Sequence, residues 1–478
     1  MMNAHSTKFA GARISTRIVE IVSNTTYQYF FLATITFLAV VLRFYKLGAW
    51  SFWIDEIYEI GYSLQAMARF PDLTRVSLLL TGITLHYLPV NEWSARLVPA
   101  IIGIVSIPIL YFPIKKLFNP AVALLAVALL AISPWHLYWS QNARFYSFLL
   151  LFYTLGQFAL FFWLESNRPG YLILAGLLLF MATLERMVAA FIAPVVVVYF
   201  IALLTMQFGR PAGLRWKNIL LLAIPAGLFA LYQVFSAGFL NTFTLEFVGH
   251  QRNPVRVLLA IVYDIGLPLF VAGILGGLYL LLQKSRIGLY LLLGAVVPVI
   301  LLVIISPFTP ASTRYVFITL PSWVILGAYA AERLLVQAQK QTKFLALAVL
   351  LVLVAEPVSQ DVLYYGFQNG NREDFKSAFA LVQKLKADGD LVVSTRDRIG
   401  DYYLGEEVVP SSELDLDAVA RSGRRTWFVI DNRTYVSPQL QQWLDEHSQL
   451  KGVYDVYIAG KIMMMRVYLF DPGKHASS

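Results

Sequence analysis

The chain carries repeated apolar runs, and these runs constrain its fold more than any other feature. A transmembrane helix needs about 20 mainly apolar residues in succession. By this criterion we expect about eleven spans, near residues 27–47, 94–114, 119–139, 145–164, 170–185, 187–207, 217–239, 257–282, 287–306, 315–333 and 342–357. The predicted fold is a polytopic α-helical membrane protein, because only internally hydrogen-bonded helices or closed barrels are stable in a bilayer.

The composition agrees with this prediction and excludes several kinds of site. Of the 478 residues, 58% are hydrophobic and 14% are charged, which is too little polar surface for a soluble protein. Cysteine is absent, so disulfides, thiolate metal sites and a cysteine nucleophile are excluded. No nucleic-acid motif accompanies the net charge of +9. Residues 1–26 are polar and lack a signal-peptide pattern, so we expect a cytoplasmic segment there.

The charges of the loops predict the orientation of the spans. With the N-terminus in the cytoplasm, every inner connection carries Lys or Arg, as the positive-inside rule requires. The first outer loop, residues 48–93, and the C-terminus then lie on the outer face. We therefore predict a transmembrane domain over residues 27–357 and an extracytoplasmic domain over residues 358–478.

The C-terminal region has the pattern of a soluble α/β domain. Helices are expected over residues 371–385, 411–423 and 437–447, and buried strands over 390–395 and 426–431. A terminal strand pair is expected over 452–460 and 461–470. This alternation predicts a small, mostly parallel α/β layer without a glycine-rich phosphate loop.

An acidic pair directly after the first span is the strongest candidate for chemistry. Asp55 and Glu56 follow Trp53 in the stretch Arg43 to Ser63. Carboxylates beside hydrocarbon are costly, so they indicate function by default. One carboxylate can accept a proton from an attacking hydroxyl, and the other can orient the first or hold a divalent cation. A solvated pair of loop acids is the alternative.

Arginine dominates the cations at the predicted outer ends of the spans. Nine of these ten residues are Arg: Arg43, Lys46, Arg69, Arg75, Arg96, Arg144, Arg186, Arg252, Arg256 and Arg314. The planar guanidinium binds phosphate through two hydrogen bonds, whereas Lys is a point charge. We therefore expect several of them around a phosphate or pyrophosphate, with pairing to lipid headgroups as the alternative.

The segment from Ser133 to Ser147 combines aromatic, amide and basic side chains. Pro134 is expected to end or bend the third span. Aromatic faces such as those of Tyr138 and Tyr146 suit both a membrane interface and the stacking of sugar rings. Gln141 and Asn142 can donate to and accept from sugar hydroxyls.

Two further charged pairs interrupt apolar sequence. Glu185 and Arg186 separate the fifth and sixth predicted spans, where they either pair with each other or face a water-filled cavity. Arg314 and Tyr315 enter the tenth span from its outer side.

In four segments the sequence resembles the GT-C class of membrane glycosyltransferases, in the protein-mannosyltransferase and aminoarabinose-transferase-like group. The segments are "LRFYKLGAWSFWIDE", "NEWSARLVPAIIGIVSIPILYFPIKKLF", "SPWHLYWSQNARFYS" and "TRYVFITLP", in the family's order and on one predicted face. The chain departs from the family pattern at Asn142, where relatives often have Glu. It also lacks the usual Pro-Pro-Leu-Tyr-Tyr stretch between Asp72 and Val90.

The resemblance implies an inverting transferase that uses a polyprenyl-phosphate sugar and acts on a lipid, glycan or protein at the outer face of a bacterial-type inner membrane. It places Asp55 as the base and Glu56 as the adjacent acid. We expect the donor phosphate near Arg96, Arg144, Arg186, Arg314 and Tyr315, and the sugar or acceptor near Trp53, Tyr138, Gln141, Asn142 and Tyr146. A divalent metal ion is an open possibility, with Glu56 as its candidate ligand.

Two functions of other classes are also compatible with the sequence. A lipid or solute transporter would use the outer arginines as an anion site, but it predicts more acids deep within the spans. A membrane scaffold that presents the α/β tail to a partner leaves the Asp55 pair unexplained.

Overall fold

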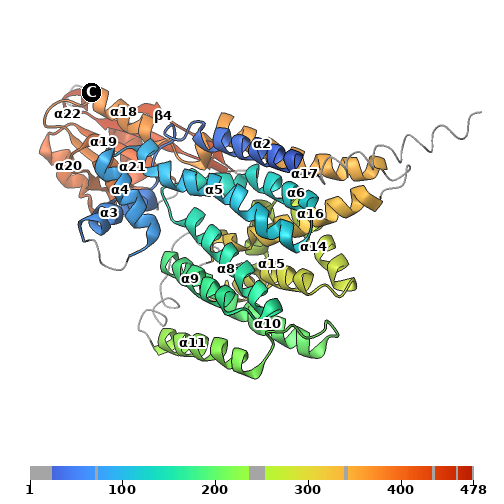
Figure 1. Ribbon diagram of the computed structural model, residues 1–478. Coiled ribbons are helices and arrows are strands. Elements are labelled where there is room, and N and C mark those ends of the chain that lie inside the picture. Colours follow the sequence, from blue (N-terminus) through green and yellow to red (C-terminus); the bar gives the residue numbers. More distant parts are fainter. Residues whose placement is uncertain are drawn as a thin grey trace, which may run out of the picture.

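The computed structural model describes residues 24–69, 74–235, 253–309, 311–337, 343–432, 436–458 and 461–475. Arg252 and all but the last three residues of the predicted cytoplasmic segment 1–26 lie outside these ranges. The helices form an elongated bundle, and a small sheet with its covering helices lies at one end (Figure 1). Helices α3 (Ile54–Ala68) and α4 (Val76–Tyr87) lie at the same end.

Long apolar helices make up the bundle, which confirms the polytopic membrane fold. By length and hydropathy, the described residues contain seven helices able to cross a bilayer, or nine if each of two bent pairs is one span. The seven are α2 (Thr25–Phe44), α5 (Glu92–Leu117), α8 (Tyr146–Ser166), η1 with α10 (Met187–Thr205), α15 (Arg286–Ile305), η2 with α16 (Thr313–Gln337) and α17 (Lys343–Gly366). The other two of the eleven predicted segments coincide with α9 (Pro169–Glu185), an apolar helix shorter than this measure requires, and α11 (Trp216–Phe235), a helix of 20 residues.

Two predicted spans are bent rather than straight. Helices α6 (Pro120–Ala131) and α7 (Pro134–Ser140) meet at 59°, and the proline at the start of α7 confirms the predicted bend. Helices α13 (Pro254–Ile265) and α14 (Leu267–Leu282) meet at 92°. Gly266 joins them with φ of +90°, a conformation that side chains with a Cβ rarely adopt.

The predicted first outer loop, residues 48–93, is largely helical, because α3 and α4 occupy most of it. These two helices approach closely at Gly82, where an added Cβ would lie 2.3 Å from the carbonyl oxygen of Ser63. Asn91 then starts α5 by accepting a hydrogen bond from the backbone N–H of Ser94 at 3.0 Å. The loop therefore forms a compact helical pair that fixes the position of Asp55 and Glu56.

The C-terminal region contains a five-stranded sheet in the order β2-β1-β3-β7-β4. The strands are β1 (Leu391–Ser394), β2 (Val409–Pro410), β3 (Thr426–Asp431), β4 (Gln449–Val453) and β7 (Met465–Phe470), with β5 (Val456–Ile458) and β6 (Lys461–Met463) as a separate hairpin. Strands β1, β2 and β3 are parallel, but β7 is antiparallel to both β3 and β4. The prediction of a mostly parallel layer is therefore wrong, because the last strand inserts between β3 and β4 in the opposite direction.

Helices cover both faces of this sheet. The connecting elements are η3 (Asn369–Asn371), α18 (Phe375–Leu385), α19 (Asp397–Leu404), η4 (Ser411–Glu413), α20 (Leu416–Ser422), α21 (Pro438–His447) and α22 (Pro472–His475). Side chains of α18 and α19 pack on one face, and those of α20 and α21 on the other. Ile54 and Ile57 of α3 pack against the α18 side, so the domain supports the helix that carries the acidic pair.

Candidate active site

Asp55 lies in the first turn of α3, where a negative charge is favoured by the helix dipole. Its side chain is 27% exposed, and its Oδ2 atom lies 3.1 Å from Nη1 of Arg314 and 3.6 Å from Nη2 of Arg144. Arg144 also donates to the backbone carbonyl of Asp55 at 3.1 Å. The carboxylate is thus partly accessible and held by two guanidinium groups from distant parts of the chain.

Further arginines gather beside Asp55 around the ring of Phe145. The guanidinium carbons of Arg75, Arg144 and Arg186 lie 5.2, 5.0 and 5.8 Å from the centre of this ring. Such cation–π contacts hold cations together that would otherwise repel one another. The guanidinium carbon of Arg314 likewise lies 5.7 Å from the centre of the Tyr315 ring.

Two other acids share this arginine cluster, defined here as Arg75, Arg144, Arg186 and Arg314. Glu59 accepts from Arg75 and Arg144 at 3.0 Å each. Glu185 instead accepts from the backbone N–H and hydroxyl of Ser77, at 2.9 and 2.5 Å. Within the described residues Arg186 has no ion-pair partner.

The cluster is therefore a cationic site of the kind that binds phosphate. Four arginines face three carboxylates, Asp55, Glu59 and Glu185, so the positive charges are in excess. Arg144, Arg186, Arg314 and Tyr315 of the predicted phosphate set come together here.

Glu56 lies in a different environment, although it is the next residue in the chain. Its side chain is fully buried, and its two oxygens accept from Nε and Nη2 of Arg96 at 2.8 Å each. The backbone N–H of Ala143 donates to Oε1 at 2.8 Å, and Nε of Arg372 lies 3.6 Å from Oε2. Burial alone would raise the pKa of the Glu56 carboxyl, but the charges of Arg96 and Arg372 outweigh it, and the pKa is lowered.

The residues around Asp55 do not fit a divalent cation. Both oxygens of Glu56 are already occupied by a guanidinium, and those of Asp55 and Glu59 face arginines, which would repel a metal ion. No group of three or more His, Asp or Glu side chains with metal-binding geometry occurs in the part of the chain that the structure describes. Glu56 is therefore better explained as a structural anion than as a metal ligand.

Several residues predicted to contact substrate instead support the fold. Arg96 is fully buried and also donates to the backbone carbonyls of Leu47, Trp50 and Ser51, so it lies outside the arginine cluster. Its position at the centre of a protein hydrogen-bond network leaves no surface for a phosphate.

Gln141 and Asn142 are fully buried as well. Nε2 of Gln141 donates to the carbonyls of Leu42, Arg43 and Tyr45 at the end of α2, and its Oε1 accepts from Tyr364. Oδ1 of Asn142 accepts from the indole N–H of Trp53 at 3.1 Å. These amides therefore fix α2 and the start of α3, rather than presenting both of their polar atoms to a sugar.

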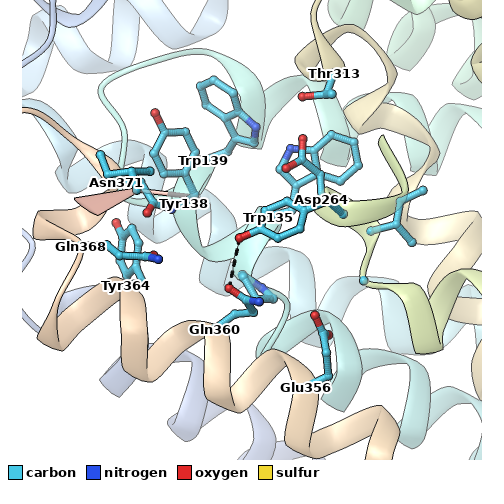
Figure 2. A pocket seen from close by; sticks show the side chains of 15 residues that line it. Trp135, Tyr138, Trp139, Asp264, Thr313, Glu356, Gln360, Tyr364, Gln368 and Asn371 are labelled. Atoms are coloured by element: carbon cyan, nitrogen blue, oxygen red, sulfur yellow. Dashed lines mark hydrogen bonds between the residues drawn. The ribbon is translucent and has the colours of Figure 1, made fainter. Parts of the chain in front are cut away.

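The predicted aromatic contacts divide into a core residue and a cavity residue. Tyr146 is 1% exposed and its ring centre lies 3.8 Å from that of Trp139, so it belongs to the core. Tyr138 lines a cavity of about 250 Å³ next to the site, together with Trp135 and Trp139 (Figure 2).

Two residues of the site carry no role in the sequence-based prediction. Arg75 appears there only among the outer arginines, and Glu59 is absent. Glu59 follows Asp55 by four residues, which places both acids on one side of α3. That spacing is the signal that would have identified it.

Comparisons with known proteins give a family match over part of the chain and several solved structures of similar fold. Residues 76–231 match the family described as dolichyl-phosphate-mannose-protein mannosyltransferase. No curated protein matches the sequence.

Among solved structures, the fold is similar to that of ArnT from Cupriavidus metallidurans in the apo state, with a TM-score of 0.57, 14% identity, and coverage of 94% of this chain and 98% of that one. ArnT bound to undecaprenyl phosphate matches with a TM-score of 0.54, 16% identity, and coverage of 93% and 98%. The oligosaccharyltransferase AglB from Archaeoglobus fulgidus, in complex with an inhibitory peptide and a dolichol-phosphate, matches with a TM-score of 0.55, 13% identity, and coverage of 92% and 74%. The Archaeoglobus enzyme has also been solved with zinc and sulfate.

Proposed function

We propose that this protein, a GT-C-type membrane glycosyltransferase by its family match and its fold, transfers a sugar from a polyprenyl-phosphate donor to a hydroxyl or amine. Transfer inverts the anomeric carbon and takes place at the outer face of the membrane. Structures of similar fold hold undecaprenyl phosphate and dolichol-phosphate, which supports this class of donor.

The observation that carries the proposal is the pairing of Asp55 with Arg144 and Arg314. A transferase of this kind needs a base for the acceptor and cations for the leaving phosphate, placed close together. Here one partly exposed carboxylate contacts two guanidinium groups at 3.1 and 3.6 Å. A general base and a phosphate site are thus adjacent.

The contacts of Asp55 also define a sequence of events. The donor phosphate competes for the guanidinium groups that hold Oδ2 of Asp55, and its binding releases this oxygen to face the acceptor. The acceptor oxygen or nitrogen then forms a bond to the anomeric carbon, while the bond from that carbon to the phosphate oxygen breaks. Asp55 takes the acceptor proton, and polyprenyl phosphate leaves with its charge held by the arginine cluster.

Glu56 acts in this scheme as a positioning residue. Its contacts with Arg96, Ala143 and Arg372 tie the first turn of α3 to α5, to the segment before α8 and to the start of the C-terminal domain. The direction in which Asp55 points is set by this turn. No step is assigned to a metal ion, because the carboxylates near Asp55 are already paired with arginines.

The charge pattern supports the proposed orientation. Helix α5 begins at Glu92, near α3, and ends with Lys115 and Lys116. Basic residues favour the cytoplasmic side, which supports the proposed position of α3, the arginine cluster and the C-terminal domain on the outer face.

A donor panel tests the proposal. The purified protein in liposomes is incubated with polyprenyl-phosphate sugars labelled in the sugar, and with membranes from a strain that lacks the protein. We expect one donor to lose its label to an acceptor, with release of polyprenyl phosphate. No use of any donor, combined with protein-dependent movement of lipids or solutes across the bilayer, would instead support a transporter.

A further inference from the structure

The cavity beside the arginine cluster has the opposite electrostatic character. It has a volume of about 250 Å³, and its lining includes the carboxylates of Asp264 and Glu356. Its described lining contains no Lys, Arg or His. A phosphate would be repelled here, so the cavity suits a neutral or amine-bearing group and excludes the phosphate of the donor.

The remaining walls suit a hydroxylated head group. Figure 2 shows Asp264 and Thr313 on one side of the cavity, and Tyr138, Tyr364 and Asn371 on the other. Amide side chains can donate to and accept from hydroxyl groups. Trp139 is 5% exposed, and its indole N–H has no hydrogen-bond partner among the described residues. An unpaired buried donor in a cavity wall is expected to bind a ligand or water.

An apolar groove lies next to this cavity, between α14, α16 and α17. The groove has a volume of about 780 Å³, and its lining includes Leu267, Val271, Val352 and Leu353. Gly266 lines the cavity and directly precedes Leu267, which lines the groove. Glu356 also lines the cavity and follows Leu353 of the groove by about one helical turn on α17. Gly266 and Glu356 pack closely where the cavity and the groove adjoin, since an added Cβ on Gly266 would lie 2.7 Å from Oε2 of Glu356.

The groove is positioned where part of a lipid chain can lie. Leu345 and Leu353 of α17 both line it, and eight residues of helix correspond to about 12 Å. Its helices cross the apolar part of the bundle, so the groove opens toward hydrocarbon. A polar cavity beside an apolar groove matches an amphipathic molecule.

We propose that the acceptor is a membrane lipid, with an uncharged or amine-bearing head group in the cavity and its chain in the groove. The inference rests on the proposed function, since it identifies the second substrate of that reaction. Thr313 bonds to Asp264 and is followed by Arg314, which contacts Asp55. The acceptor head therefore lies next to the base, and the donor phosphate belongs with the arginine cluster.

Groove-filling variants test the proposal. Val352→Trp places a large side chain in the groove, and Leu351→Trp is the matched control, because Leu351 faces outward on the same helix and is 67% exposed. Both proteins are reconstituted with labelled donor and a total lipid extract from the strain that lacks the protein. We expect label in the lipid fraction, an increase of about tenfold in the apparent KM for lipid with Val352→Trp, and no change with Leu351→Trp.

The outcomes separate this inference from the proposed function. If the wild-type protein leaves the lipid extract unlabelled but labels protein or soluble glycan when whole membranes are supplied, the lipid acceptor is wrong and the transferase stands. If Val352→Trp instead raises the KM for the donor, the groove holds the polyprenyl chain and the inference is overturned. Absence of any donor use contradicts the proposed function itself.

Charge variants give a second, independent test. Asp264→Asn with Glu356→Gln removes the negative charge of the cavity while keeping its shape. Vesicles containing monoglucosyl diacylglycerol or phosphatidylglycerol serve as competitors for the labelled reaction. The neutral lipid is expected to compete with the wild-type protein, and the anionic lipid only with the double variant. Equal competition by both lipids with the wild-type protein would refute the charge argument.

Discussion

Asp55 and Glu56 are neighbours in the chain, but their carboxylates face opposite environments. Asp55 is 27% exposed and contacts Arg314 and Arg144 at the edge of the site, whereas Glu56 is fully buried against Arg96. One helical turn thus carries the accessible carboxylate of Asp55 and the buried carboxylate of Glu56, which anchors that turn to Arg96. In the proposed function Asp55 carries out the chemistry and Glu56 fixes the position of the helical turn.

Replacing Glu56 tests its role as the anchor. Glu56→Gln leaves the charge of Arg96 buried without its partner, which costs about 3–5 kcal/mol of folding stability. We expect a lower midpoint of thermal unfolding and a lower kcat, with the KM for donor little changed. Asp55→Asn should leave the midpoint nearly unchanged. Equal thermal stability of Glu56→Gln and wild type would contradict the structural role.

The acid stability of the protein should depend on the same residue. The pKa of Glu56 is lowered in the folded protein from 4.5, so its stabilising effect is present above that pH and is lost as the pH falls through the folded pKa. The difference in unfolding midpoint between wild type and Glu56→Gln should therefore shrink on acidification below pH 4.5. A difference that stays constant across the acid range would argue against this linkage.

Arg314→Lys tests the phosphate site. The compact ammonium group of Lys replaces a planar guanidinium that can donate two hydrogen bonds to one phosphate. We therefore expect an increase of about tenfold in the dissociation constant of the donor, equivalent to about 1.4 kcal/mol. Binding is measured by titration of a polyprenyl-phosphate sugar. Arg168→Lys is the control, since Arg168 precedes α9 and contributes no side-chain hydrogen bond to its start. Unchanged binding would remove Arg314 from the donor site.

Replacing Tyr403 tests the link between the C-terminal domain and the predicted first outer loop. Its hydroxyl accepts from the backbone N–H of Phe52 and donates to Oε1 of Glu92, both at 2.9 Å. Tyr403→Phe leaves that N–H without its partner, at a cost of about 1–3 kcal/mol. Thermal unfolding should show this loss, whereas Tyr457→Phe, at an exposed site, should have no effect. Similar midpoints for the two variants would exclude the link.

The sequence predicts much of this arrangement, and its failures share one cause. The apolar runs identify the bundle, and the structure brings Asp55 of the acidic pair together with Arg144, Arg186 and Arg314. The predictions for Arg96 and Gln141 fail because the sequence does not show whether a polar side chain is buried or exposed. Only the tertiary contacts show that both side chains donate to backbone carbonyls and that Arg96 also donates to Glu56.

The sheet and the bent helices illustrate the same limit. Local patterns locate β3 and β7, but the direction in which β7 inserts depends on pairing between distant segments. The glycine at 266 indicates a break in an apolar run only once its φ of +90° is known. Local propensity thus predicts the elements, and long-range packing decides how they are joined.

The most direct test of the central claim is single-turnover sugar transfer by Asp55→Asn, with donor binding measured on the same preparation. Shape is kept and only the capacity to accept a proton is lost, so we predict a rate at least about 100-fold lower. Donor binding should be unchanged or tighter, because a negative charge leaves the arginine cluster. Asp388→Asn, at an exposed loop position, should transfer at the wild-type rate. A transfer rate for Asp55→Asn within about twofold of wild type would contradict the assignment of Asp55 as the base.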